Sequence, residues 1–321
     1  MPSALERLEV LRGVKECQHF KQRSFFNVSF IVDSVRQVLL GYTVPMKTLL
    51  TLMLFSFSLN LFAETATLKI ASLNLQGWID TSSQRAMMMR DLFKSKRLMD
   101  GVSLMITQES IEQSPLSTTD QLALELGWKS YSERRVSDNE GLGVLYPKRA
   151  DIEEILTLQL RAKASAKDFS RMALMARINH SKIGKIRVVN VHLAHQVDGG
   201  NIRKNQLREV IAWIQELEKS DPSDLVVMGG DFNTGTTEQS YSAEFDILTK
   251  SSFRFKRVQS SGASYSYKDM KTGNRRLIDH FFVSQANRLS IKSVNAMIYR
   301  EITDLKISDH NLLILKIDIE I

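Results

Sequence analysis

The sequence predicts one α/β domain in which strands and helices pack in layers. Short apolar runs such as residues 225–228 lie between turn residues, which suits strands covered on both faces. Residues 83–99 and 202–218 repeat apolar side chains at helical spacing. No linker rich in Gly, Ser or Pro divides residues 64–321, so they predict a single domain rather than two.

Residues 46–63 are typical of a secretory signal peptide, because Lys47 precedes a nearly unbroken apolar stretch that ends at Ala63. The stretch spans roughly 21 Å as a helix, short of the about 30 Å of a bilayer core, which disfavours a membrane anchor. We also disfavour a buried core helix, since Lys47 and Ala63 bracket the run. Cleavage after Ala63 and a secreted or periplasmic location are therefore expected. Residues 1–45 are then an extension or a mis-annotated start, with translation from Met46.

Removing this leader changes the charge and the cysteine count. Residues 1–63 hold seven basic and four acidic residues, so the net charge falls from +7 for the whole chain to +4 for residues 64–321. A mild positive charge permits phosphate-rich partners without requiring them. The single cysteine, Cys17, lies in the leader, so the mature domain has no disulfide framework and depends on core burial.

Strand and helix signals follow one another along residues 64–321. A helix over 118–126 is expected to stop at Gly127, a polar loop covers 131–139, and a further helix surrounds 243–250. Strands 171–179 and 185–192 form a hairpin across the turn at 182–184. The other predicted strands are 67–75, 102–107, 141–146, 225–228, 277–283, 291–299 and 312–319, and residues 260–267 form a segment rich in Ser and Tyr.

Eight polar residues lie at or beside the ends of these strands. They are Asn74, Glu109, His192, Asp231, Asn233, Asp279, Asp309 and His310. Any one of them alone is more often a turn residue or a helix cap. Together they offer carboxylate, amide and imidazole ligands without cysteine, which favours Mg²⁺ or Mn²⁺ and excludes a thiolate zinc site.

The motifs around these residues resemble the endonuclease/exonuclease/phosphatase family of metal-dependent phosphohydrolases. The matching pieces are SLNLQGW, ITQES, VVNVHL, GGDFNTG, RLIDHFFV and ISDHNLL, in the family's order, and they span residues 68–319. The resemblance implies a four-layered α/β sandwich of two packed mixed β-sheets flanked by helices, with the cleft at one sheet edge. It also implies hydrolysis of phosphate esters by metal-assisted attack of water.

The resemblance further implies a role for each residue. Glu109 is expected to be the principal metal ligand, with Asn74 and Asp309 completing or tuning the coordination directly or through water.

Asp231 resembles the residue that orients or deprotonates the attacking water, and Asn233 the one that holds the scissile phosphate. Asp279 would pair with His310 and fix its tautomer. His192 would donate a hydrogen bond to a non-bridging oxygen or help to protonate the leaving group.

Other residues are weaker candidates, since an ordinary structural role explains each at least as well. They are Arg203 and Gln206 on the helix after His192, His195 at a strand end, Arg275 and Arg276 in a polar turn, and Tyr265 and Tyr267 in an alternating strand.

These observations predict a secreted, Mg²⁺- or Mn²⁺-dependent phosphohydrolase, with a phosphodiesterase acting on nucleic acid favoured. The alternatives are a phosphatase or a phospholipase C-like hydrolase of sphingomyelin or inositol phosphates. An alternative of another class is a binding module that keeps the fold without chemistry, against which the intact polar residues argue. No obligate protein partner is expected.

Overall fold

The computed structural model describes residues 64–76, 82–112, 115–136, 139–163, 170–195, 200–234, 238–285 and 289–321. The expected extension at 1–45, the expected signal peptide at 46–63 and two turn positions of the motifs, Gly77 and Gly235, lie outside the described residues. Within the described ranges no helix has the length and apolar character needed to cross a bilayer.

A seven-stranded mixed sheet forms one half of the domain. Its order is β10 (Ser260–Gly262), β14 (Ser290–Tyr299), β15 (Leu312–Glu320), β1 (Thr65–Asn74), β2 (Leu104–Ile111), β4 (Glu140–Tyr146) and β3 (Lys129–Arg134). Strands β1 and β2 run parallel, as do β10 and β14, and the other neighbours are antiparallel.

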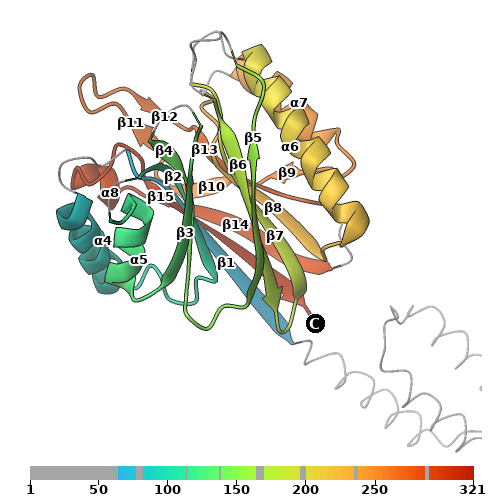
Figure 1. Ribbon diagram of the computed structural model, residues 1–321, viewed down its shortest axis with the longest axis horizontal. Coiled ribbons are helices and arrows are strands. Elements are labelled where there is room, and N and C mark those ends of the chain that lie inside the picture. The colour runs from blue at the N-terminus through green and yellow to red at the C-terminus, as the bar shows by residue number, and fades with distance from the viewer. Residues whose placement is uncertain are drawn as a thin grey trace, which may run out of the picture. The chain divides into compact units, whose positions relative to one another are not determined.

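A six-stranded mixed sheet forms the other half. Its order is β5 (Ile152–Gln159), β6 (Met172–His180), β7 (Gly184–His192), β8 (Leu225–Asp231), β13 (Asp279–Val283) and β9 (Lys256–Arg257). Only β7 and β8 run parallel in it. A small antiparallel hairpin of β11 (Tyr267–Lys268) and β12 (Arg275–Arg276) stands apart from both sheets (Figure 1).

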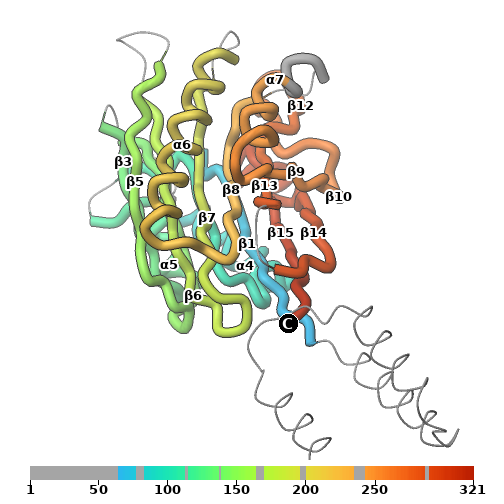
Figure 2. The backbone as a smooth tube through the Cα atoms, turned by 90° about the vertical axis from the view of Figure 1, so that its right-hand side faces the viewer, coloured from blue at the N-terminus to red at the C-terminus, as the bar shows by residue number. Residues whose placement is uncertain are grey.

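The two large sheets pack face to face, and helices cover their outer faces (Figures 1 and 2). The helices are α4 (Ser82–Lys96), α5 (Thr118–Leu126), α6 (Gly200–Ser220), α7 (Glu238–Thr249) and the short α8 (Glu301–Asp304). Phe93 of α4 packs with Met105 behind the seven-stranded sheet, whereas Leu207 of α6 packs with Met228 behind the six-stranded sheet. These layers confirm the predicted four-layered sandwich.

A buried polar link joins the two sheets below the strand ends. Gln108 on β2 donates from Nε2 to Oδ1 of Asn190 on β7 over 2.7 Å, and both side chains are fully buried. Asn190 donates in turn to the backbone oxygens of Thr107 and Gly143. Because unpaired buried amides are costly, this link fixes how the sheets align.

Two sequence expectations need correction. Residues 129–134 form the edge strand β3, although a polar loop was predicted over 131–139. Its side chains are polar on both faces because β3 is an edge strand without a buried face, so no alternation appears in the sequence. The patterns above also do not predict β5, an edge strand in which no side chain is fully buried.

Candidate metal-dependent active site

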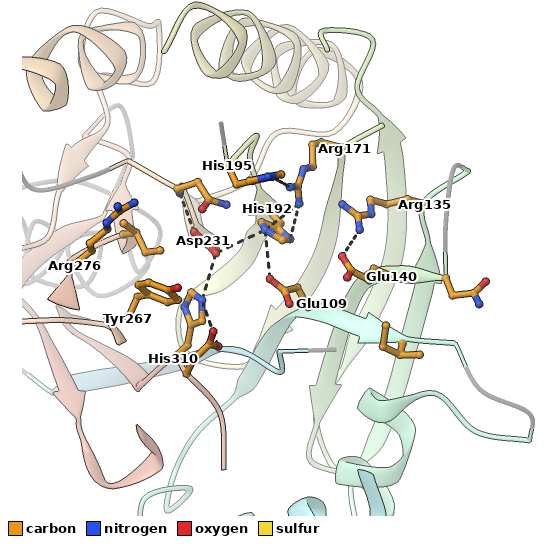
Figure 3. Close-up of a pocket in the computed structure, with 15 residues that line it drawn as sticks. Glu109, Arg135, Glu140, Arg171, His192, His195, Asp231, Tyr267, Arg276 and His310 are labelled. Atoms are coloured by element: carbon orange, nitrogen blue, oxygen red, sulfur yellow. Dashed lines mark hydrogen bonds and ion pairs between the residues drawn. The ribbon is translucent and has the colours of Figure 1, made fainter. Parts of the chain in front are cut away.

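A cavity of about 570 Å³ opens where central strands of both sheets end. Figure 3 shows Glu109, His192, Asp231 and His310 converging in it, with Arg135 and Glu140 on one side and Tyr267 and Arg276 on the other. The sequence places these side chains up to about 200 residues apart. The strand register brings them together.

Three strands deliver their residues side by side. His192 and Asp231 are register partners at the ends of the parallel strands β7 and β8. Asp279, the first residue of β13, is the antiparallel partner of Asp231. Asn74 ends β1 beside Gln108 of β2. Because the two sheets face each other, these ends meet at one rim of the sandwich.

Glu109 reaches the cavity because of a β-bulge. The pairing of β2 with β4 shifts between Gln108 and Ser110, which leaves Glu109 as the extra residue, with a φ of 52°. This backbone region is unfavourable for residues other than glycine, so the surrounding pairing must maintain it. The bulge turns the Glu109 carboxylate out of the sheet and leaves it 25% exposed.

Asp231 sits at the centre of the cluster and is almost fully buried. Gly229 precedes it where a Cβ would lie 2.3 Å from the Phe281 ring, so only glycine fits at this close approach. The Asp231 carboxylate accepts a hydrogen bond from the backbone N–H of Asn233 at 2.8 Å and another from Nδ2 of Asn74 at 3.2 Å. Burial, and then the neighbouring Asp279, raise the pKa of Asp231 to about 7.

His310 is held by carboxylates on three sides. Its Nδ1 lies 2.9 Å from Oδ2 of Asp279, and its Nε2 lies 3.8 Å from Asp231 and 3.9 Å from Asp309. Burial lowers the pKa of His310, but the charge and hydrogen bond of Asp279, followed by the other carboxylates, outweigh it and raise the pKa to about 10. His310 is therefore an imidazolium at neutral pH, with its Nε2–H aimed into the cavity.

His192 is the opposite case. Its Nε2 lies 3.8 Å from Glu109 and 3.7 Å from Asp231, while Nη1 of Arg171 lies 2.9 Å from Nε2 and 3.0 Å from Nδ1. Burial and then the charge of Arg171 hold the pKa of His192 well below its usual value. At neutral pH His310 is therefore charged, whereas His192 is neutral.

The residues present fit a hard divalent cation. Glu109, His192 and Asp231 offer ligand atoms within 4.8 Å of one another. In the described part of the chain, Oδ1 of Asp309 and Oδ1 of Asp279 are buried without a hydrogen-bond partner. Desolvation raises the pKa of both Glu109 and Asp309, although the charge of His310 opposes this shift. Oxygen and imidazole donors of this kind suit Mg²⁺ or Mn²⁺.

All eight residues predicted at strand ends belong to this cluster, but only six of them line the cavity. Those that line the cavity are Glu109, His192, Asp231, Asn233, Asp309 and His310. Asn74 and Asp279 lie behind them and are buried. The Nδ2 of Asn74 donates to Glu109 at 2.9 Å and to Asp231, and its Oδ1 accepts from the backbone of Gln76. In this arrangement Asn74 positions two carboxylates, and its predicted ligation of the metal stays a prediction.

Sequence reasoning missed the basic wall of the cavity. Arg171, just before β6, contacts both His192 and His195. Arg135 forms an ion pair with Glu140, the first residue of β4. Both arginines are more than 90% buried. The only sequence signal was a charged residue directly before an apolar strand. His195, for which a strand-end role was slightly favoured, lines the cavity.

Arg203 and Gln206 do not lie on a solvent-exposed face of α6. Both are buried under the segment that follows His192. Arg203 donates to both carboxylate oxygens of Glu244 at 2.9 and 3.0 Å and to the Ala194 carbonyl, and Gln206 accepts from the Ala194 N–H. These bonds anchor the chain between β7 and α6, so the two residues position the site without entering it.

This anchor predicts a large stability effect. Glu244→Ala removes the carboxylate from a guanidinium that is only 7% exposed, and breaking such a buried pair costs about 3–5 kcal/mol. Urea unfolding should show this loss in the free energy of unfolding. The control Glu216→Ala, in an exposed pair with Lys219, should cost less than about 1 kcal/mol. Equal effects in the two variants would contradict the anchoring role.

No protein-family model matches the sequence, and no curated protein matches it. Solved structures do match. An endonuclease/exonuclease/phosphatase from Bacteroides vulgatus is 18% identical with a TM-score of 0.62 and covers 79% of this chain and 100% of its own. A mannosyl-6-phosphatase from Bacteroides thetaiotaomicron is 19% identical with a TM-score of 0.59, over 78% and 99%. The beta toxin of Staphylococcus aureus is 14% identical with a TM-score of 0.61, over 77% and 98%.

These matches confirm, at the level of the fold, the resemblance that the motifs predict. The matched proteins bear different names, a phosphatase and a toxin among them, so the shared fold does not identify a substrate. The chain thus combines the fold of these endonuclease/exonuclease/phosphatase structures with a buried cluster of His, Asp and Glu side chains.

Proposed function

We propose, on the premise that this chain has the endonuclease/exonuclease/phosphatase fold, that it is a Mg²⁺- or Mn²⁺-dependent phosphohydrolase. The favoured reaction is hydrolysis of a phosphodiester, and the favoured substrate is nucleic acid. The observation that carries the proposal is the convergence of Glu109, Asp231 and His310 in one cavity, from strands far apart in the sequence. Oδ1 of Asp309 in the same cavity is buried and accepts no hydrogen bond from the described residues, which supports a cation there.

Glu109 and Asp309 would hold the metal ion, with Asn74 keeping the Glu109 carboxylate in place. Bound there, the ion would neutralise charge on the phosphoryl oxygens and lower the pKa of a water ligand. His192 and Asp231 offer further metal-ligand atoms close to the Glu109 carboxylate. The rest of the mechanism depends on the chain's own side chains.

Asp231 is the residue that orients the attacking water and accepts its proton. A base works best with a pKa near the operating pH, and burial raises the pKa of Asp231 to about 7. Its second oxygen is fixed by the Asn233 N–H, which sets the direction of the free lone pairs. Asn233 lines the cavity beside it, where its side chain would meet the phosphate.

The two imidazoles stabilise charge at different positions. His310, protonated through its contact with Asp279, would donate from Nε2 to an oxygen that gains negative charge in the transition state. Nη1 of Arg171 lies within 3.0 Å of both ring nitrogens of His192, and the ring nitrogen that carries the hydrogen would donate it to a non-bridging oxygen. Since the pKa of His192 is lowered, hydrogen-bond donation suits it better than proton transfer to the leaving group.

The experiment that tests this proposal is a substrate panel. Plasmid DNA, RNA, sphingomyelin, inositol phosphates and bis(p-nitrophenyl) phosphate are each incubated with Mg²⁺, with Mn²⁺ and with chelator. The proposal expects metal-dependent hydrolysis, with the nucleic acids cleaved fastest. Preference for a lipid or an inositol phosphate would establish one of the alternative substrates. No hydrolysis of any ester would leave a binding module with this fold.

We further propose that the protein is secreted or periplasmic, with translation from Met46 and cleavage after Ala63. The charged start, apolar stretch and small final residue support this. Amino-terminal sequencing of the exported protein should read from Glu64. A mature protein that begins before Met46 would contradict the proposed start.

Acid should weaken metal binding. Desolvation raises the pKa of Glu109 and Asp309, the proposed metal ligands, and the protons that these carboxyl groups take up as the pH falls compete with the metal for the same oxygens. The metal concentration for half-maximal activity should therefore be higher at pH 6 than at pH 8. Calorimetric titration with Mn²⁺ should show the same shift. An identical affinity at both pH values would contradict the carboxylate site.

A further inference from the structure

A hairpin of residues 267–276, formed by β11, β12 and the turn between them, projects beside the cavity; we call it the basic hairpin (Figure 1). We propose that the basic hairpin is a binding surface for the backbone of a nucleic-acid strand, which continues past the phosphate held in the cavity. This inference rests on the proposed function for its scissile phosphate. The cavity residues alone do not require that the basic hairpin binds nucleic acid.

The base of the basic hairpin is bonded to the chain segment that carries Asp309 and His310. The backbone N–H of Lys268 donates to the Asp309 carbonyl over 2.8 Å, and Tyr267 forms a β-bridge with His310. Tyr267 and its register partner Arg276 both line the cavity. A nucleic-acid strand that leaves the cavity on the side of Tyr267 and Arg276 therefore passes the base of the hairpin.

The turn of the basic hairpin is held in one conformation. The carboxylate of Asp269 accepts from the backbone N–H groups of Lys271 and Thr272 at 2.8 and 2.9 Å. The backbone of Asp269 also bonds to Asn274 and Gly273, and Gly273 supplies the positive φ of 76° that the turn requires. A surface fixed in this way loses little entropy when it binds a ligand.

The charge of the basic hairpin is positive and unbalanced. Its four cations are Lys268, Lys271, Arg275 and Arg276. Its single acid, Asp269, accepts two backbone hydrogen bonds of the turn at Oδ1, and no ion pair joins these four cations to an acidic group in the described part of the chain. Exposed cations elsewhere do have carboxylate partners, such as Lys219 with Glu216 and Lys250 with Asp246.

The dimensions suit an extended polyanion. Lys268, Arg275 and Arg276 lie on the two short strands of the basic hairpin, and Lys271 lies in the turn beyond them. The cations thus extend from the edge of the cavity to the turn, and a nucleic-acid strand presents successive phosphates, about one every 3.4 Å along the axis of a duplex, to such a row of charges. A single phosphate ester bound in the cavity would not reach the tip. Arg275, stacked over the Tyr265 ring at 4.7 Å, is held for planar contact with a phosphate.

A lipid surface fits the basic hairpin less well. Insertion into a bilayer requires several exposed apolar side chains. Between residues 268 and 276 only Met270 is apolar, and it is 39% exposed. The charge therefore favours a soluble polyanion over a membrane.

The test removes three cations that lie outside the cavity. The variant Lys268→Gln/Lys271→Gln/Arg275→Gln keeps Arg276 and every backbone bond of the turn. A matched control, Lys94→Gln/Lys96→Gln/Lys129→Gln, removes the same charge from α4 and from the end of β3 that pairs with Tyr146, away from the cavity. Binding of a fluorescein-labelled 20-nucleotide oligonucleotide is followed by anisotropy in chelator at 50–200 mM KCl, so that no cleavage occurs.

The basic-hairpin variant should bind the oligonucleotide at least tenfold more weakly at 100 mM KCl. The slope of log affinity against log salt should fall by about 2 to 3, since each lost phosphate contact lowers it by about 0.7 to 0.9. Turnover of bis(p-nitrophenyl) phosphate with Mn²⁺ should stay within twofold of the parent, because that ester does not reach the substituted residues. The control should match the parent in both assays.

An oligonucleotide affinity and salt slope equal to those of the control would overturn the inference. Hairpin-dependent binding to phosphatidylserine vesicles, without oligonucleotide binding, would overturn it in favour of a membrane surface. Failure of the parent to hydrolyse any ester would overturn the proposed function. The anisotropy measurement would still decide whether the basic hairpin binds nucleic acid, so the two failures are distinguishable.

Discussion

Replacing Asp231 by asparagine is expected to lower kcat about a thousandfold. The change keeps the shape of the side chain and its contact with the Asn233 N–H, but an amide cannot take a proton from water. Loss of one acid–base or charge-stabilising group typically costs two to four powers of ten in rate. The measurement is kcat on the best ester of the substrate panel at saturating metal.

The same variant should fold at least as stably as the parent at pH 8. The raised pKa of Asp231 shows that burial and Asp279 disfavour its ionised form, so the unfolded state holds that charge more easily. This destabilisation grows as the pH rises from the ordinary pKa of 3.8 to about 7 and is complete at pH 8, and a neutral amide removes it. A melting temperature equal to or above that of the parent would separate lost chemistry from lost structure.

Asp246→Asn is the matched control, because that carboxylate pairs with Lys250 on the surface of α7. It should leave kcat unchanged. A kcat of Asp231→Asn equal to that of the parent would contradict the assignment of Asp231 as the base.

Replacing Asp279 by asparagine is expected to lower kcat about a hundredfold at pH 8, with a smaller loss at pH 6. Asp279 is a positioning residue that acts through His310, and the contact between them is 2.9 Å. The pKa of His310 is raised to about 10 in large part by this carboxylate, so the parent keeps an imidazolium at both pH values. Without Asp279 the pKa falls, and the imidazolium is lost first at the higher pH.

A double variant distinguishes this role from a purely structural one. Asp279→Asn/His310→Ala should be no slower than His310→Ala alone, because residues that act as a unit have non-additive effects. The alkaline limb of the pH–rate profile of Asp279→Asn should also move to lower pH. Additive losses and an unmoved limb would show that Asp279 does not act through His310.

The sequence alone was informative about the strand ends. Buried strands that close on Asn74, Glu109, His192 or Asp231 are visible because apolar runs and the polar residue that ends them are local features of the chain. Edge strands were not predictable in this way. Strand β3 has no buried face, so its polar sequence is indistinguishable from a loop.

The inner organisation of the site needed the tertiary structure. Nothing local marks the bulge that turns Glu109 into the cavity, since the extra residue is defined only by the register of β4. Arg171 and Arg203 appear as ordinary charged residues in the sequence. Their buried partners, His192 and Glu244, lie 21 and 41 residues away.

The sequence by itself therefore determined the layered α/β fold and the set of polar residues that end its strands, because both depend on the local periodicity of apolar side chains. Only the tertiary structure decided which of these residues share a cavity, which imidazole is charged, and which arginines serve the site. Those properties depend on burial and on distances between segments far apart in the chain, and neither is a property of any short stretch of sequence.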